Sequence, residues 1–140
     1  MYGIIATWRM ALEGISKADS MLKNNESAAD SIEEAIKAVE DFEYYKSVGY
    51  GGLPNEEMEV ELDAAFMDGD TLEFGCVGGV KDFANPVSIA RSLMHYDANN
   101  FLIGQGAEKY ASRHGFERKT MLTDLSLIHI SEPTRPRLIS

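Results

Sequence analysis

A glycine-rich segment, Ser47 to Asn55, divides the chain into two parts with different hydrophobic spacing. Before it, apolar residues recur at intervals of three and four from Trp8 to Leu22, and a similar stripe follows from Ala28 to Val39. This spacing is typical of amphipathic helices. After it, Val60 to Met67 alternates between apolar and other residues, as a half-buried strand does. Three glycines and a proline predict that the dividing segment is itself a loop.

The second helical stretch has a clear beginning. Ser27, with Asp30 three positions later, is close to a capping box. Its expected buried stripe consists of Ala28, Ile32, Ala35, Ile36 and Val39, and its expected solvent face consists of Glu33, Glu34, Lys37 and Glu40. The other expected elements are, in chain order, a strand at Ile4 to Ala6, a turn at Asp68 to Asp70, a strand at Leu72 to Val80, a helix that starts at Asn85-Pro86, a strand at Phe101 to Ile103, and a helix at Gly106 to Ser112 capped by Gly115. This order predicts a layered α/β or α+β domain.

Charge and cysteine content exclude several classes of partner. The 140 residues carry a formal charge of −10, which argues against nucleic acids and anionic membranes as main partners. No apolar run is long enough for a membrane span, and Met1 to Trp8 lacks the features of a secretory signal. The single cysteine, Cys76, cannot form an internal disulfide, so the expected compartment is the reducing cytoplasm.

The last sixteen residues differ in character from the rest. Leu125 to Ser140 has no clear helical or strand register, and its stretch from Leu125 to Arg135 resembles a translated sequencing-library adapter. We therefore expect two parts: residues 1–124 as a truncated piece of a longer protein, and residues 125–140 as a non-native tail.

Common site motifs are absent from the sequence. His95 and His114 have no neighbours at metal-ligand spacing, and the Asp68 turn lacks the late bidentate glutamate of a calcium loop. Cys76 is expected to be a buried structural thiol. We predict no metal site and no cofactor.

Five segments, taken in order, resemble the glycosylasparaginase and asparaginase (isoaspartyl peptidase) family of N-terminal nucleophile hydrolases. They are Ala6 to Ala11 (ATWRMA), Ser47 to Asn55 (SVGYGGLPN), Val60 to Gly69 (VELDAAFMDG), Asn85 to Arg91 (NPVSIAR) and Phe101 to Ala107 (FLIGQGA). The similarity extends from about Ile4 to Asp124. The resemblance implies an α+β fold, a four-layer αββα sandwich of which this chain is only the N-terminal, α-chain portion.

The resemblance also implies a mechanism and partners. Such enzymes cut themselves into an α and a β chain, and the cut exposes a threonine whose hydroxyl attacks the side-chain amide of asparagine. The free α-amine is the base, with a pKa near ~8 that suits this task. The implied partners are a small-molecule substrate (asparagine or glycosyl-asparagine), the chain's own β chain, and a second αβ unit in a homodimer.

The site residues carried over by the resemblance are few. Trp8 matches a tryptophan that lines the substrate cleft, although a plain core position is the alternative. Gly49, Tyr50, Gly51 and Gly52 form a loop expected near the site. No catalytic residue is carried over, because Thr120 and Thr123 are not followed by the glycine of the family's nucleophile motif.

The expected function is therefore hydrolysis of asparagine side-chain amides, with the glycosylasparaginase branch preferred and this chain inactive alone. The alternatives are an L-asparaginase or isoaspartyl dipeptidase, and a non-catalytic binding or scaffold domain.

Overall fold

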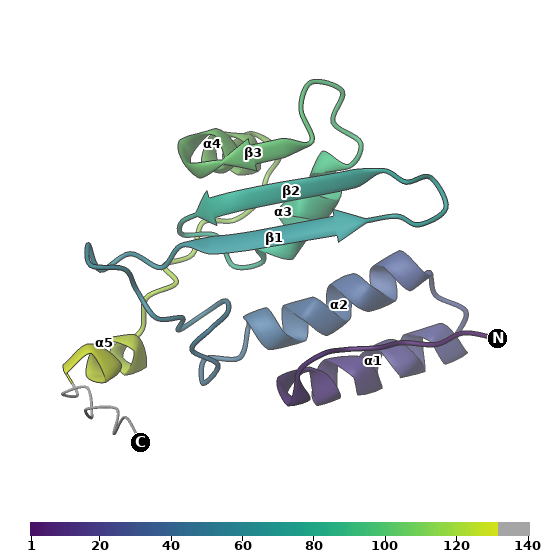
Figure 1. Ribbon diagram of the computed structural model, residues 1–140, viewed down its shortest axis with the longest axis horizontal. Helices are drawn as coiled ribbons and strands as arrows, with labels where there is room; N and C mark the ends of the chain where they lie inside the picture. The colour runs from purple at the N-terminus through teal and green to yellow at the C-terminus, as the bar shows by residue number, and fades with distance from the viewer. Residues whose placement is uncertain (132–140) are drawn as a thin grey trace, which may run out of the picture.

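The computed structural model describes residues 1–131. A 3-10 turn and five helices accompany three strands (Figure 1): η1 Arg9–Ala11, α1 Leu12–Lys23, α2 Ala28–Glu40, β1 Leu62–Met67, β2 Phe74–Val80, α3 Pro86–Leu93, β3 Phe101–Ile103, α4 Gly104–Arg113 and α5 Asp124–Ser131. The α+β class is confirmed.

The three strands form one sheet in the order β1-β2-β3. β1 and β2 are antiparallel, and the turn between them is closed by Asp68, whose Oδ1 accepts hydrogen bonds from the amides of Asp70 (2.8 Å) and Thr71 (3.1 Å). β2 and β3 are parallel and are connected through α3. The predicted hairpin turn and both of its strands are confirmed.

An irregularity in the β1–β2 register is stabilised by a side chain. The register shifts between Leu62 and Ala64, and the Oδ1 atom of Asp63 accepts a hydrogen bond of 2.8 Å from the amide of Gly79. Gly79 has a φ of 58°, a conformation that costs glycine little. Asp63 thus bonds to the backbone of the neighbouring strand.

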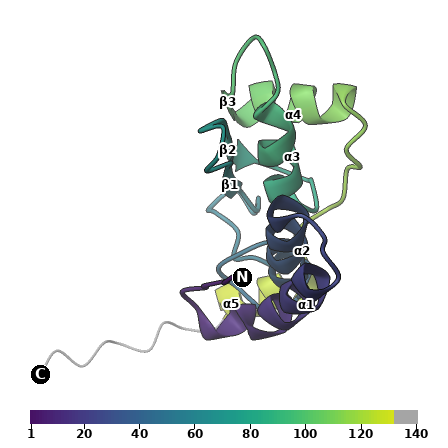
Figure 2. The same cartoon turned by 90° about the vertical axis from the view of Figure 1, so that its right-hand side faces the viewer.

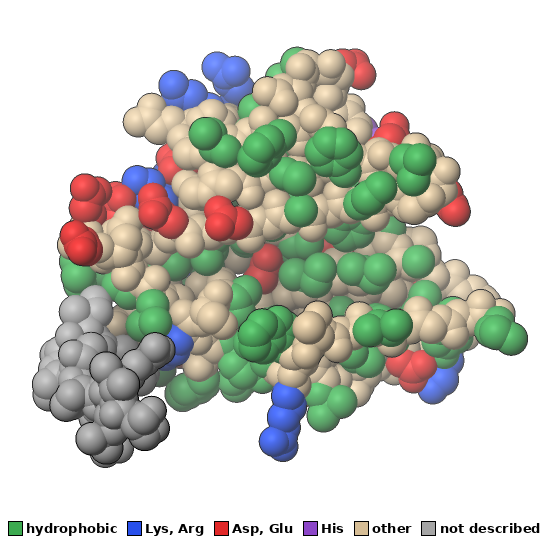
Figure 3. Space-filling model, in the orientation of Figure 1, with side chains coloured by type: hydrophobic (Ala, Val, Ile, Leu, Met, Phe, Trp, Pro, Cys, Tyr) green, Lys and Arg blue, Asp and Glu red, His purple; other side chains and the backbone are tan. Residues whose placement is uncertain are grey.

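Helices cover only one face of the sheet. Figure 2 shows α3 and α4 on one side of the sheet, while α1 and α2 lie below it, beyond the edge formed by β1. Between the sheet and α3 and α4 lies the main core, formed by Phe66, Val77, Val80, Phe83, Val87, Ile89, Ala90, Leu93, Ala107, Tyr110 and Ala111. The opposite face carries exposed hydrophobic side chains (Met67, Phe74, Phe101 and Ile103), and hydrophobic atoms are visible across it in Figure 3.

The two N-terminal helices pack closely because small residues line their contact. Ala18 is fully buried, and a Cβ added to Gly14 would lie 2.3 Å from the carbonyl oxygen of Ala35. Ser27 caps α2 as predicted, since its side chain accepts a hydrogen bond from the amide of Asp30. The chain reverses between the helices at Asn25, which has a φ of 62°.

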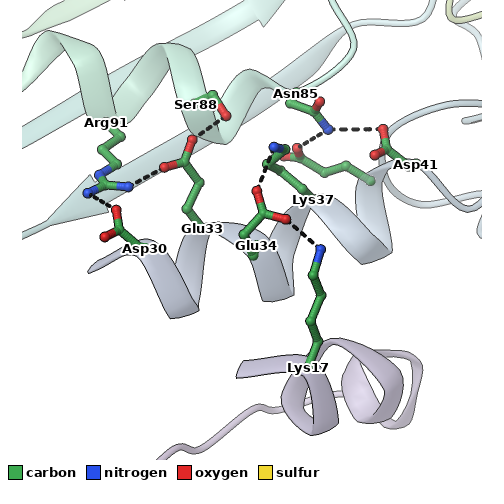
Figure 4. Close-up of polar contacts among 10 residues, drawn as sticks. Lys17, Asp30, Glu33, Glu34, Lys37, Asp41, Asn85, Ser88 and Arg91 are labelled. Carbon is green, nitrogen blue, oxygen red and sulfur yellow. Dashed lines mark hydrogen bonds and ion pairs between the residues drawn. The ribbon is translucent and has the colours of Figure 1, made fainter. Parts of the chain in front are cut away.

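Polar groups join α2 to α3 (Figure 4). Arg91 pairs with Asp30 at 2.7 Å and with Glu33, and Glu33 also accepts a hydrogen bond from the hydroxyl of Ser88. The side chain of Glu33 is only 18% exposed. The α1–α2 pair is therefore attached to α3, which packs on the sheet, by ion pairs as well as by apolar packing.

Some sequence predictions are wrong. Ile4 to Ala6 forms no strand: the segment runs alongside α1, where no strand lies beside it to pair with, and Ile5 is 98% exposed. On α2, the buried residues are Ser31, Ala35 and Glu40, whereas Ala28 and Ile32 are exposed. α2 meets the core and α3 through Ala29 and Ile36 together with the polar side chains of Asp30, Glu33 and Glu40, so only part of the predicted stripe is buried.

The beginning of the expected tail also differs from the prediction. Asp124–Ser131 is helical, and Ser126 within it is fully buried and hydrogen-bonded to Thr123. The rest of the expected tail, residues 132–140, lies outside the described residues. Within residues 1–131, no helix has the length and apolar character that a membrane span requires.

Candidate functional site

An apolar groove of about 650 Å³ lies between the N-terminal segment and the α1–α2 pair. Its walls include Ile5 and Trp8 from the N-terminal segment and Ser47 and Val48 from the glycine-rich loop. Its floor includes all five residues of the predicted α2 stripe: Ala28, Ile32, Ala35, Ile36 and Val39. The stripe is therefore an apolar face as predicted. It lines the groove, although Ala35 is buried and Ile36 also packs against the main core.

Trp8 lies on the wall of this groove and is 71% exposed. Its backbone is extended, with a φ of −115° and a ψ of 142°, and its carbonyl accepts a hydrogen bond from the amide of Ala11 that starts the helical region. Within the described residues Trp8 is therefore a surface residue. The indole is available to a ligand or to another part of a larger protein.

The glycine-rich loop begins at the same groove. Ser47 and Val48 line it, and the chain then turns inward so that Gly49, Gly51 and Gly52 are buried. Two of these glycines are required by geometry. Gly49 and Gly51 have φ values of 64° and 79°, and an added Cβ would lie 2.0 Å from the carbonyl oxygen of Glu40 or 2.6 Å from that of Glu43, respectively.

Three contacts fix the position of this loop. The amide of Tyr50 donates a 2.7 Å hydrogen bond to the carbonyl of Glu40, and the amide of Gly51 donates one of 2.9 Å to the carbonyl of Met121. The ammonium of Lys119 lies 3.9 Å from the centre of the Tyr50 ring. Cations in that position are attracted by the face of an aromatic ring. The loop is thus held by the end of α2 on one side and by residues 119–121 on the other.

Glu40 is the residue that sequence reasoning missed at this site. It was expected to face water, yet it is 3% exposed. Its carboxylate accepts 3.3 Å hydrogen bonds from the amide of Val87 and the side-chain amide of Asn85. Asn85 itself makes no capping bond to α3, and Pro86 has no N–H, so Glu40 caps α3 from a distant part of the sequence. Burial raises the pKa of Glu40 to about 7.

The remaining polar candidates have structural partners. Thr123 bonds to Ser126 at the start of α5, consistent with the prediction that it is not a nucleophile. His114 stacks on Tyr110 at 3.9 Å, whereas the His95 side chain is 70% exposed. Cys76 is half-buried, less buried than predicted, because it lies in the middle strand of a sheet with one uncovered face. Within residues 1–131, no three His, Cys, Asp or Glu side chains are grouped as metal ligands would be.

The groove can bind but offers little reactive chemistry of its own. Its lining is mostly apolar, and its hydroxyls are those of Tyr2, Thr7 and Ser47. The Tyr2 hydroxyl donates a 2.8 Å hydrogen bond to the carboxylate of Asp19. The groove is therefore suited mainly to holding an apolar group.

Comparison with known proteins gives a consistent result. The profile of the Asparaginase family matches residues 5–136. The chain is 34% identical over 120 residues to an N(4)-(beta-N-acetylglucosaminyl)-L-asparaginase of Elizabethkingia miricola, a match covering 86% of this chain and 35% of that protein. It is 37% identical over 121 residues to a plant-type L-asparaginase of Thermococcus kodakarensis (86% and 35%).

A third relative is named for a further activity. The chain is 35% identical over 127 residues to an isoaspartyl peptidase/L-asparaginase of Rattus norvegicus, covering 86% of this chain and 38% of that protein. The chain thus spans little more than a third of the length of these relatives. With the family profile matching most of its length, the chain belongs to the asparaginase family.

Proposed function

We propose that this chain is the N-terminal, α-chain portion of an enzyme that hydrolyses asparagine side-chain amides. The observation that carries the proposal is that Trp8 and the start of the glycine-rich loop, 39 residues apart in sequence at Ser47, line the same groove. Both belong to the segments that carry the resemblance to the family. The wall of a substrate cleft is thereby assembled from the two places expected to supply it.

The nucleophile of this enzyme is a threonine outside the present chain. Self-cleavage before that threonine frees its α-amine, which takes the hydroxyl proton while the oxygen attacks the amide carbon. An acyl-enzyme forms as the nitrogen leaves, and water then releases aspartate. Thr120 and Thr123 do not supply this group, because neither is followed by the glycine of the family's nucleophile motif. The chain by itself is therefore inactive.

The uncovered sheet face supports the proposed four-layer architecture. Met67, Phe74, Phe101 and Ile103 are each at least 45% exposed on one face, and the apolar groove lies on the same side of the molecule (Figure 3). Exposed apolar areas of this extent mark surfaces that another element covers. We propose that a second sheet, supplied largely by the β chain, packs there, and that the αβ units form a homodimer. On this reading residues 125–140 replace the native continuation.

The leaving group is best assigned to a glycosylamine, because ATWRMA and SVGYGGLPN are closest to the glycosylasparaginase branch. The relatives' names also include L-asparaginase and isoaspartyl peptidase. The source gene read in frame beyond Asp124 would be expressed and assayed with glycosyl-asparagine, asparagine and an isoaspartyl dipeptide. We expect the highest kcat/KM with glycosyl-asparagine. Hydrolysis of none of them would favour the scaffold alternative, for which the apolar groove is the binding feature.

A further inference from the structure

A buried carboxyl residue, Glu40, lies at the base of the glycine-rich loop that borders the candidate site. We propose that Glu40 is a positioning residue for this loop: its neutral carboxyl keeps the end of α2 docked and the Gly49–Gly52 loop in place, and its ionised form releases both. The inference rests on the proposed function only for the loop's role beside the site. The coupling itself depends on contacts within residues 40–87.

The loop is attached to Glu40 through the backbone. The 2.7 Å bond from the Tyr50 amide ends on the carbonyl of Glu40, and Gly49 packs so closely on the same carbonyl that no Cβ would fit. A shift of the last turn of α2 must therefore move residues 49 and 50. Lys46 adds a second tie, because its ammonium donates to the carbonyls of Glu43 (3.1 Å) and Gly51 (3.3 Å).

The side chain of the same residue fixes the last turn of α2 to α3. Its two oxygens accept 3.3 Å bonds from the Val87 amide and from the side chain of Asn85. Asn85 also donates a 3.0 Å bond to Asp41. Glu40 thus connects two elements. Its side-chain carboxyl group bonds to the start of α3, and its backbone carbonyl bonds to the glycine-rich loop.

The surroundings disfavour the charged carboxylate. Burial is the largest cause of the raised pKa, and the negative charges of Asp41 and Glu33 add to it, whereas the bonds from Asn85 and Val87 oppose it. The cations of the neighbouring elements have other partners. Arg91 on α3 pairs with Asp30 and Glu33, Lys37 on α2 with Glu34, Lys46 bonds to backbone carbonyls, and Lys119 lies over the Tyr50 ring.

This arrangement makes the docked loop sensitive to pH near neutrality. With a pKa of about 7, the carboxyl is mainly neutral at pH 6 and mainly ionised at pH 8. An ionised group gains hydration by leaving the interior. Departure of the carboxylate frees the end of α2, and with it the loop that forms part of the groove wall.

Trypsin cleavage after Lys46 tests the coupling in the 140-residue chain. The cleavage product is followed by mass spectrometry from pH 6 to pH 8, and the rate is divided by that of a reference peptide at each pH. If only the ionised form opens, the corrected rate rises about tenfold, following the ionised fraction. Glu40→Gln removes this rise. Glu57→Gln, which removes an exposed carboxylate, keeps it. A rise that persists in Glu40→Gln would overturn the proposal.

A measurement on the unmodified chain does not depend on the folding of a variant. Carbon-13 NMR follows the Glu40 carboxyl, and the Tyr50 amide is followed in the same samples. We expect both to titrate with one midpoint near pH 7. A carboxyl midpoint at the ordinary value of a glutamate, or a Tyr50 amide that does not follow it, contradicts the proposal. Neither readout involves amide hydrolysis, so failure of the proposed function is a separate outcome.

Discussion

A carboxyl oxygen of Glu40, the last residue of α2, accepts a hydrogen bond from the amide of Val87 in the first turn of α3. A side-chain oxygen at a helix N-terminus satisfies an amide that has no partner within the helix. This bond joins α2 to α3, next to the glycine-rich loop that borders the candidate site. Several of the following predictions therefore concern this junction.

The stability contributed by Glu40 depends on pH. Between the unfolded pKa near 4.5 and the folded value of about 7, the native state holds a proton that the unfolded state has released. The free energy of unfolding therefore falls as the pH rises through this window, by about 3 kcal/mol in total. Urea denaturation at several pH values, with Glu40→Gln as reference, measures the difference. A difference independent of pH between 4.5 and 7 would show that Glu40 titrates normally.

Gly49→Ala is expected to destabilise the chain by about 2–4 kcal/mol, because the new Cβ meets the Glu40 carbonyl and the residue keeps a positive φ. Gly69→Ala is the control, since nothing lies within 4 Å of its added Cβ. Its effect should stay within about 0.5 kcal/mol. Equal effects of the two substitutions would mean that the loop is not held against α2.

Arg91→Met is expected to cost about 2 kcal/mol, because it leaves the half-buried carboxylate of Glu33 without its cation. Lys23→Met breaks the exposed pair with Asp19 and should cost less than about 0.5 kcal/mol. Chemical denaturation compares the two variants at equal ionic strength. If both cost the same, the contact between α2 and α3 does not depend on this ion pair.

Trp8→Ala should leave the stability of the chain nearly unchanged, because the side chain is 71% exposed. In the extended enzyme the same substitution is expected to reduce kcat/KM at least tenfold while self-cleavage continues. Leu12→Ala is a suitable control, since Leu12 is 64% exposed and does not line the groove. Unchanged kinetics in Trp8→Ala would remove Trp8 from the substrate cleft.

The sequence predicted those elements whose signals are local. Ser27 caps α2, Asp68 closes the hairpin, and Pro86 begins α3, each because a side chain acts on the backbone a few residues away. The register of Val60 to Met67 follows from alternation. Such features depend little on the rest of the fold.

The errors arose where distant partners decide the outcome. Ile4 to Ala6 has strand-like residues, but a strand also needs a neighbour to pair with. Glu40 was expected to face water because its hydrogen-bond donors, Asn85 and Val87, lie more than 40 residues later in the chain. The α2 stripe has the spacing of a core face, yet which partner covers such a face cannot be read from one helix.

The central claim is that this chain supplies part of a substrate cleft while the nucleophile comes from elsewhere. Aspartate release from glycosyl-asparagine and asparagine tests it most directly, with the 140-residue chain and the in-frame extended gene product assayed side by side. The account predicts no release by the chain alone, and release by the extended protein after cleavage that exposes an N-terminal threonine. Release by the chain alone, or an extended protein that hydrolyses neither amide and exposes no threonine, would contradict it.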